Sequence, residues 1–272
     1  MKRYLIFVIL ILFIGCNREF NKTNGVINIV DNSDKEEVVW IDNFDGTEVD
    51  RNNWTFEIGN GVNGWGNNEL QYYTAENSEV RDGKLIITAK KESKNGYDYT
   101  SSRLKTQGKF SFTYGTVEVR AKLPKGQGIW PAIWMLGEDI DIDTVGWPNC
   151  GEIDIMELLG QEPNKIHGTI HGPGYYGAGG KSASYTLSSG DFSDDFHIFK
   201  IVWDITSIKW YVDNTLYHTE TTNDVSNWVF DHDFFILLNV AVGGNWPGEP
   251  DDNITSFPQT MEIDYVKVTT YK

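Results

Sequence analysis

Three carboxylates lie close together in one apolar stretch of the sequence: Glu152, Asp154 and Glu157, separated only by isoleucine and methionine residues. Side chains in a regular strand alternate between its two faces, so Glu152 and Asp154 share a face while Glu157 points the other way. A β-bulge at Ile155 or Met156 would return Glu157 to the face of the other two acids. We therefore expect a row of three carboxylates on one side of a bulged strand.

Two carboxylates placed on either side of a glycosidic bond can hydrolyse it. One protonates the leaving oxygen, and the other attacks the anomeric carbon or activates water. Along a bulged strand the Cα atoms of Glu152 and Glu157 would lie about 13 Å apart, so both long side chains must lean together over a concave surface. Acids near a sheet edge can also serve solubility alone. Their alternation with isoleucine favours a strand that has one face on a core and the other in a cleft.

At these residues the chain resembles glycoside hydrolase family 16, whose signature is Glu-x-Asp-x-x-Glu on a bulged strand. The resemblance covers nearly all of residues 38–272 and extends to Trp54 and to residues 65–73, 103–106, 130–135, 167–171 and 239–248. Within the family the set is most similar to the laminarinase type, which acts internally on β-1,3-glucan. It implies a retaining mechanism with Glu152 as nucleophile, Glu157 as acid and base, and Asp154 bonded to Glu152. No cofactor is implied for catalysis.

Two other functions remain open from the sequence. One is an enzyme that acts chiefly on mixed-linkage β-1,3-1,4-glucan, as lichenases do. The other is a non-catalytic carbohydrate-binding sandwich, since a fold alone does not imply chemistry. Such a binding protein would keep aromatic platforms and lose the acids, whereas all three acids are present here.

Aromatic residues are abundant, with ten Trp and thirteen Tyr, and sugar rings stack their C–H faces on aromatic rings. Trp130 and Trp134 are four residues apart and share a strand face, and the resemblance implies that both are sugar platforms. Trp147 and Trp246 stand in loop-like contexts, where a buried position is less common. We expect all four in the substrate cleft.

Three polar residues match family positions close to the sugar. Arg103 and Asn67 match residues that hydrogen-bond sugar hydroxyls, with a surface salt bridge or a turn-capping Asn as the alternative. His171 matches a histidine close to the acid/base, where it could bond a hydroxyl or raise the pKa of the glutamate. Packing within a strand is the alternative for this histidine.

The resemblance also implies a structural calcium ion on the convex side. Its ligands would be the side chain of Asp264 and the backbone carbonyl of Gly83, and oxygen donors of this kind suit Ca²⁺. Asn43 replaces the acid that is usual near the first strand.

The N-terminus is typical of an exported bacterial lipoprotein. Residues 1–15 contain Lys2, Arg3 and then an apolar run that is too short to span a bilayer, which indicates a signal peptide. Cys16 follows in a context that resembles a lipid attachment site. We expect residues 16–37 to be a flexible tether and residues 38–272 a single catalytic domain, anchored to the cell envelope at the outer membrane or cell surface.

The formal net charge is −16, and removing residues 1–15 would take away Lys2 and Arg3 and no acid, leaving −18. Such a chain repels phosphate backbones and anionic membrane surfaces, whereas a neutral β-glucan feels no net repulsion. We expect no nucleic-acid partner, membrane contact only through the anchor, and a monomer. Cys150 would be the only cysteine besides Cys16, so we expect no intramolecular disulfide and a packed, unreactive thiol.

The strand signals predict an all-β fold. Alternating or continuous apolar runs occur at residues 84–89, 116–121, 197–203, 208–212 and 261–268. In the second run Val117, Val119 and Ala121 would face the core, as in a half-buried antiparallel strand. Asp213 and Asn214 between two runs predict a tight hairpin turn. We expect a two-sheet antiparallel β-jelly-roll sandwich with one concave face.

Overall fold

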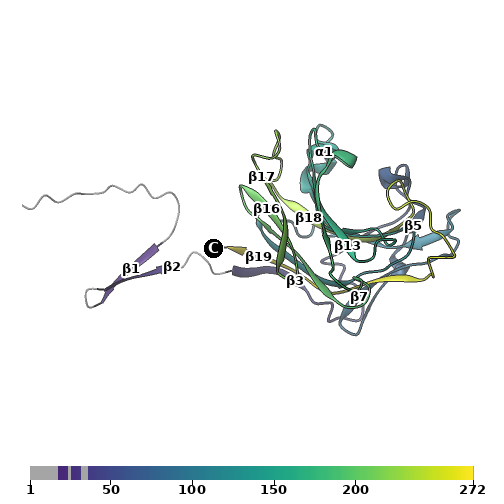
Figure 1. The fold of residues 1–272 in the computed structure, drawn as a ribbon, viewed down its shortest axis with the longest axis horizontal. Helices are drawn as coiled ribbons and strands as arrows, with labels where there is room; N and C mark the ends of the chain where they lie inside the picture. The colour runs from purple at the N-terminus through teal and green to yellow at the C-terminus, as the bar shows by residue number, and fades with distance from the viewer. Residues whose placement is uncertain (1–17, 24–25, 32–35, 272) are drawn as a thin grey trace, which may run out of the picture.

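The computed structural model describes residues 18–23, 26–31 and 36–271, and the predictions for residues 1–15 and Cys16 fall outside them. Two large antiparallel sheets form a sandwich (Figure 1). The outer sheet has the order β17-β16-β15-β10-β19-β7-β6, with β3 paired to β19. The sheet that carries the acids has the order β14-β13-β12-β11-β18-β9-β4. The predicted sandwich of two antiparallel sheets is confirmed.

The strands of the outer sheet are β3 (Glu36–Asp42), β6 (Ser78–Arg81), β7 (Lys84–Ala89), β10 (Gly115–Lys122), β15 (His197–Trp203), β16 (Ser207–Val212), β17 (Thr215–Thr221) and β19 (Gln259–Tyr271). Those of the other sheet are β4 (Thr55–Glu57), β9 (Arg103–Lys105), β11 (Ile129–Gly137), β12 (Glu152–Leu158), β13 (Lys165–His171), β14 (Lys181–Thr186) and β18 (Phe234–Val242). All five predicted runs coincide with strands.

Short elements lie between these strands. They are a π-helical turn η1 (Gly64–Asn68), the 3-10 turns η2 (Ala75–Asn77), η3 (Glu138–Asp141) and η4 (Gly177–Gly179), and the helical turn α1 (Gly146–Asn149). The strands β5 (Gln71–Tyr73) and β8 (Tyr99–Ser101) pair in parallel. The described residues contain no helix long and apolar enough to cross a membrane.

A hairpin of β1 (Arg18–Thr23) and β2 (Val26–Asp31) lies within the segment expected as a tether. These two strands pair with each other and with neither large sheet, and Figure 1 draws them beside the sandwich. The same segment also includes the start of β3 at Glu36. The described part of the expected tether therefore contains regular structure.

Local sequence explains why these strands form. In β10 the alternating residues Val117, Val119 and Ala121 are fully buried, as predicted. Asp213 and Asn214 both have positive φ, 47° and 69°, which is the backbone of the tight turn that suits the twist of two antiparallel strands. The hairpin predicted between β16 and β17 is thus confirmed.

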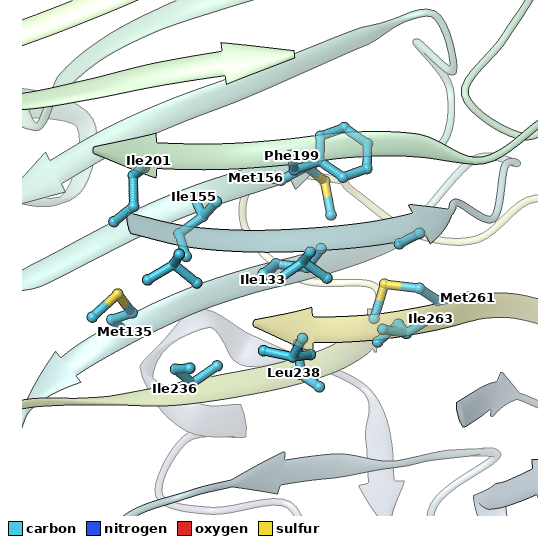
Figure 2. Packing of buried hydrophobic residues seen from close by; sticks show 14 of the residues in the cluster. Ile133, Met135, Ile155, Met156, Phe199, Ile201, Ile236, Leu238, Met261 and Ile263 are labelled. Atoms are coloured by element: carbon cyan, nitrogen blue, oxygen red, sulfur yellow. The ribbon is translucent and has the colours of Figure 1, made fainter. Parts of the chain in front are cut away.

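The core fills the space between the two sheets. The core cluster includes Ile133 and Met135 of β11, Ile236 and Leu238 of β18, and Met261 and Ile263 of β19 (Figure 2). The same cluster includes Ile155 and Met156 of β12. Burying each large apolar side chain contributes about 1.5–3 kcal/mol. This core holds the sheet that carries the acids on a rigid support.

Candidate active site

A β-bulge in β12 places the three acids on one face. Towards β11, Glu157 stands opposite Ala132 and Asp154 opposite Trp134, so three steps along β12 correspond to two along β11. Towards β13 the register shifts in the same interval. The two intervening side chains, Ile155 and Met156, are 1% and 0% exposed in the core. The predicted bulge is confirmed, and both Ile155 and Met156 are buried in the core.

The three acids line a cleft of about 970 Å³ on this sheet. The residues expected to bind substrate also line it, namely Asn67, Arg103, Trp130, Trp134, Trp147, His171 and Trp246. The structure thus places all seven along this cleft, and their contacts with sugar stay predictions.

Glu152 lies at the start of β12 between an indole and an imidazole. Trp147 Nε1 donates a hydrogen bond of 2.7 Å to its Oε2, and His171 Nε2 lies 3.7 Å from its Oε1. Burial raises the pKa of Glu152 to about 8, with a further contribution from the negative charge of Asp154. His171 and the Trp147 hydrogen bond oppose this rise because they stabilise the carboxylate.

Asp154 is the most deeply buried of the three acids, with 2% of its surface exposed. Its Oδ2 lies 3.2 Å from His171 Nε2, and Trp210 Nε1 fixes the strand by donating to its backbone carbonyl at 2.8 Å. Burial raises the pKa of Asp154 to about 8, and a hydrogen bond with Glu152 lowers it. A bond between two carboxyls requires one of them to hold a proton, so Asp154 can share a proton with Glu152.

Glu157 accepts a hydrogen bond of 3.1 Å from Trp130 Nε1. Burial raises its pKa well above the ordinary value, and the negative charges of Asp154 and Glu152 raise it further. Burial and the neighbouring negative charges therefore favour a protonated Glu157, which suits a proton donor. Glu152 accepts the Trp147 N–H, which favours its charged form and suits a nucleophile.

Arg103 lies between two aromatic rings that also line the cleft. Its guanidinium carbon lies 4.4 Å from the ring centroid of Trp65 and 4.7 Å from that of Trp134, and its Nε is 2.5 Å from Glu57 Oε2. Only 10% of the Arg103 side chain is exposed. Its ion pair therefore lies inside the cleft wall, and the surface salt bridge considered from the sequence is wrong.

A hydrogen-bonded network that the sequence did not single out lies behind Arg103. Trp134 Nε1 donates to Asn239 Oδ1 at 2.8 Å, Asn239 Nδ2 to Tyr73 Oη at 3.3 Å, and Tyr73 Oη to Glu69 Oε2 at 3.2 Å. Asn67 Nδ2 also donates to Glu69, at 3.3 Å, so Asn67 supports its neighbour in addition to lining the cleft. Burial raises the pKa of Glu69.

Aromatic pairs form two walls beside the acids. Trp147 meets Tyr176 edge to face, with ring centroids 5.4 Å apart, and Trp130 meets Trp246 in the same way at 5.5 Å. Trp147 and Trp246 are 45% and 41% exposed, as their loop contexts indicated. Tyr176 was missed from the sequence because it stands in a glycine-rich segment with no strand periodicity.

Cys150 is fully buried beside Leu136, Phe235 and Leu237. Burial raises the pKa of its thiol to about 12, so the reactive thiolate is scarce at neutral pH. The expected unreactive thiol is consistent with this environment.

The residues expected to hold calcium are oxygen donors. Asp264 Oδ2 lies 2.7 Å from Arg120 Nη1, so this carboxylate would have to be shared between the guanidinium and the ion. Among the described residues, the group of three or more His, Cys, Asp or Glu side chains with convergent donor atoms is Glu152, Asp154 and His171. Asp264 is not part of it.

A β-sandwich with three acids in a cleft lined by aromatic residues indicates a glycoside hydrolase. The family model for glycosyl hydrolases family 16 matches residues 66–267, and the chain belongs to this family. Its chemistry requires no cofactor for catalysis.

The chain is similar to several known β-glucanases. It is 42% identical over 252 residues to a β-glucanase of Rhodothermus marinus, covering 88% of this chain and 87% of that protein. It is 40% identical to glucan endo-1,3-beta-glucosidase A1 of Niallia circulans over 85% of this chain, and spans 37% of that longer protein. The laminarinase catalytic domain of Thermotoga maritima MSB8 is 53% identical with a TM-score of 0.84, over 87% of this chain and 99% of that one.

Proposed function

We propose that this glycoside hydrolase is an endo-acting β-1,3-glucanase that retains anomeric configuration. The observation that carries the proposal is the bulge in β12, which brings Glu152, Asp154 and Glu157 to one cleft. Relatives whose names specify β-1,3-glucan support the substrate class. The acidic chain also favours a neutral polysaccharide over a sulfated or uronic one.

The reaction takes two steps. In the first, a Glu152 oxygen attacks the anomeric carbon and forms a glycosyl ester while the bond to the leaving oxygen breaks, and Glu157 gives its proton to that oxygen. In the second, Glu157 takes a proton from water, the water oxygen bonds to the anomeric carbon, and the ester to Glu152 breaks. Asp154 disperses the changing charge on Glu152.

Product analysis tests the substrate class. The enzyme is incubated with laminarin, lichenan and agarose, and early products are separated by chromatography while NMR records their anomeric configuration. We expect laminari-oligosaccharides of several lengths in the β configuration from laminarin, and no products from agarose. Glucose alone as the first product would contradict endo action, and α products would contradict retention. A faster reaction on lichenan would favour the mixed-linkage alternative.

The proposal extends to the location of the enzyme. Residues 1–15 act as an export signal, Cys16 carries the lipid, and residues 16–37 separate the anchor from a catalytic domain of residues 38–272. Replacing Cys16 by Ala should move the protein from the membrane fraction to the soluble fraction without changing turnover on laminarin. Continued partitioning with membranes would contradict lipid anchoring.

A calcium ion held by Asp264, Gly83 and Asn43 is a further part of the proposal, supported by their oxygen donors. It predicts that EDTA lowers the melting temperature and that added Ca²⁺ restores it. In Asp264→Asn both effects should be smaller. An identical melting temperature with EDTA and with Ca²⁺ would contradict the site.

A further inference from the structure

Three side chains with metal-binding donor atoms lie close together where β12 begins and β13 ends. Glu152, Asp154 and His171 each offer a donor atom, and these three atoms all lie within 4.8 Å of one another. His171 Nε2 is 3.2 Å from Asp154 Oδ2 and 3.7 Å from Glu152 Oε1. The second Glu152 oxygen accepts the Trp147 N–H, so Oε1 is the oxygen that lies towards His171.

Two of these groups have buried atoms without a hydrogen-bond partner. Asp154 Oδ2 accepts no hydrogen bond of good geometry, and His171 Nδ1 has no partner. An imidazole with no fixed partner at Nδ1 can carry its proton there and direct the Nε2 lone pair at the two carboxylates. A buried carboxylate oxygen without a hydrogen-bond donor, such as Asp154 Oδ2, is stabilised by binding a proton or a cation.

The spacing of the donors fits a transition-metal ion. A tetrahedral Zn²⁺ with ligands at about 2.0–2.1 Å holds their donor atoms about 3.3 Å apart. The distances from His171 Nε2, 3.2 Å and 3.7 Å, lie close to that value. One imidazole and two carboxylates suit Zn²⁺ better than Ca²⁺ or Mg²⁺, which prefer oxygen donors alone.

We propose that Glu152, Asp154 and His171 form an inhibitory site for Zn²⁺ or a similar divalent transition metal. The ion would enter through the same cleft as the glucan, because all three residues line it. Bound there, it occupies the oxygen of Glu152 that attacks the anomeric carbon. Zinc and glucan therefore exclude each other.

Calorimetric titration with ZnCl₂ tests the site without reference to activity. The chelator-treated wild-type protein should bind zinc in competition with a laminari-oligosaccharide, and His171→Gln should weaken this binding by about tenfold or more. Glu152→Gln removes a different donor and should have the same effect. MgCl₂ at the same concentrations should produce no comparable binding heat.

His232→Gln is the matched control variant. His232 Nε2 lies 3.1 Å from Asp139 and its Nδ1 3.6 Å from Asp231, so it also pairs with acids but forms no three-donor group. Its loss should leave the zinc affinity unchanged. Zinc affinity that depends on His232 and not on His171 would overturn the proposal, as would the absence of zinc binding to the wild-type protein.

Inhibition kinetics give a second test. Zinc should raise KM for laminarin without lowering kcat, and EDTA should reverse the effect. Lowered kcat at saturating glucan would contradict a shared site. A protein that binds zinc through His171 but does not cleave laminarin would refute the proposed substrate and leave the zinc site intact.

Discussion

Trp147 donates its indole N–H to Glu152 at 2.7 Å although nearly half of the Trp147 surface faces solvent. The two are five positions apart in the sequence, because α1 ends at Asn149, shortly before β12 begins at Glu152. One side chain therefore forms a wall of the cleft and stabilises the charged form of the proposed nucleophile. The Trp147 ring also contacts Tyr176. Trp147 therefore links this exposed tyrosine to the acid Glu152.

Trp147→Phe should lower kcat/KM by roughly 10- to 100-fold, because a hydrogen bond to a charged group contributes about 1.5–3 kcal/mol. Loss of the donor also raises the pKa of Glu152, so the acidic limb of the pH profile should move to higher pH. Trp134→Phe is the control, since its N–H goes to Asn239. It should raise KM and leave the acidic limb in place. An unshifted acidic limb in Trp147→Phe would contradict the role of this bond.

Substitution of the two glutamates separates their roles. Glu157→Gln should lose turnover on laminarin yet still cleave an activated aryl glycoside, which needs little protonation. Glu152→Ala should lose both activities until azide is added, and then give a glycosyl azide of inverted configuration, identified by NMR. Near wild-type turnover of Glu157→Gln on laminarin would show that another residue is the acid. In a glucan complex, we expect the two carboxyl groups about 5–5.5 Å apart, as in retaining enzymes.

Glu157→Gln should also stabilise the protein at alkaline pH. The pKa of Glu157 is raised in the folded protein, so its contribution to stability is present below its unfolded pKa of about 4.3 and is lost as pH rises through the folded value. The amide cannot ionise and avoids this loss. The melting temperature of the variant, relative to wild type, should rise between pH 5 and pH 9, by roughly 2–4 °C for each kcal/mol. A constant difference across this range would contradict the assignment.

Tyr176→Ala should weaken binding of long glucans. In the sheet, β12 separates β13 and β14 from β11, β18 and β9, so a glucan cut at Glu152 must extend over both sides. Tyr176 is the exposed aromatic residue of the η4 connection between β13 and β14. Loss of its ring should raise KM for laminarin roughly 2- to 10-fold, while Tyr176→Phe keeps the wild-type value. Equal KM for both variants would argue against stacking.

Cys150→Ser should retain turnover per folded molecule, because a buried thiol with a raised pKa takes no part in the chemistry. The serine hydroxyl in an apolar cluster should lower the melting temperature. Loss of most activity in a variant with an unchanged melting temperature would contradict this prediction. Activity assays with differential scanning calorimetry measure both effects.

The strands and the bulge of this fold can be predicted because apolar side chains in a strand repeat every two residues. Runs such as residues 116–121 show the period of a strand, and the odd spacing between Asp154 and Glu157 predicts a bulge. Arg103 and Trp134 were found in the cleft through the family resemblance. Their local sequence does not reveal that the guanidinium stacks between two indoles.

The remaining features depend on contacts distant in sequence. Glu69 and Asn239 are joined through Tyr73, and no spacing rule relates Asn239 on β18 to Tyr73 on β5, 166 positions earlier in the sequence. Tyr176 and Trp147 meet only after two connections fold towards each other. Burial changed the expected electrostatics most, since sequence alone cannot show that Glu152, Asp154 and Glu157 all have raised pKa values.

The bulge in β12 also determines which side chains of the strand face the cleft and which enter the core. An odd spacing of three between Asp154 and Glu157 is compatible with one shared face only because Ile155 and Met156 both enter the core. Deleting either residue would give even spacing, and a regular strand would then still present three acids to the cleft. Three steps along β12 match two along β11, so the additional residue leaves the distance between Asp154 and Glu157 along the strand nearly unchanged. Its contribution is one more apolar side chain in the interior directly beneath the catalytic acids.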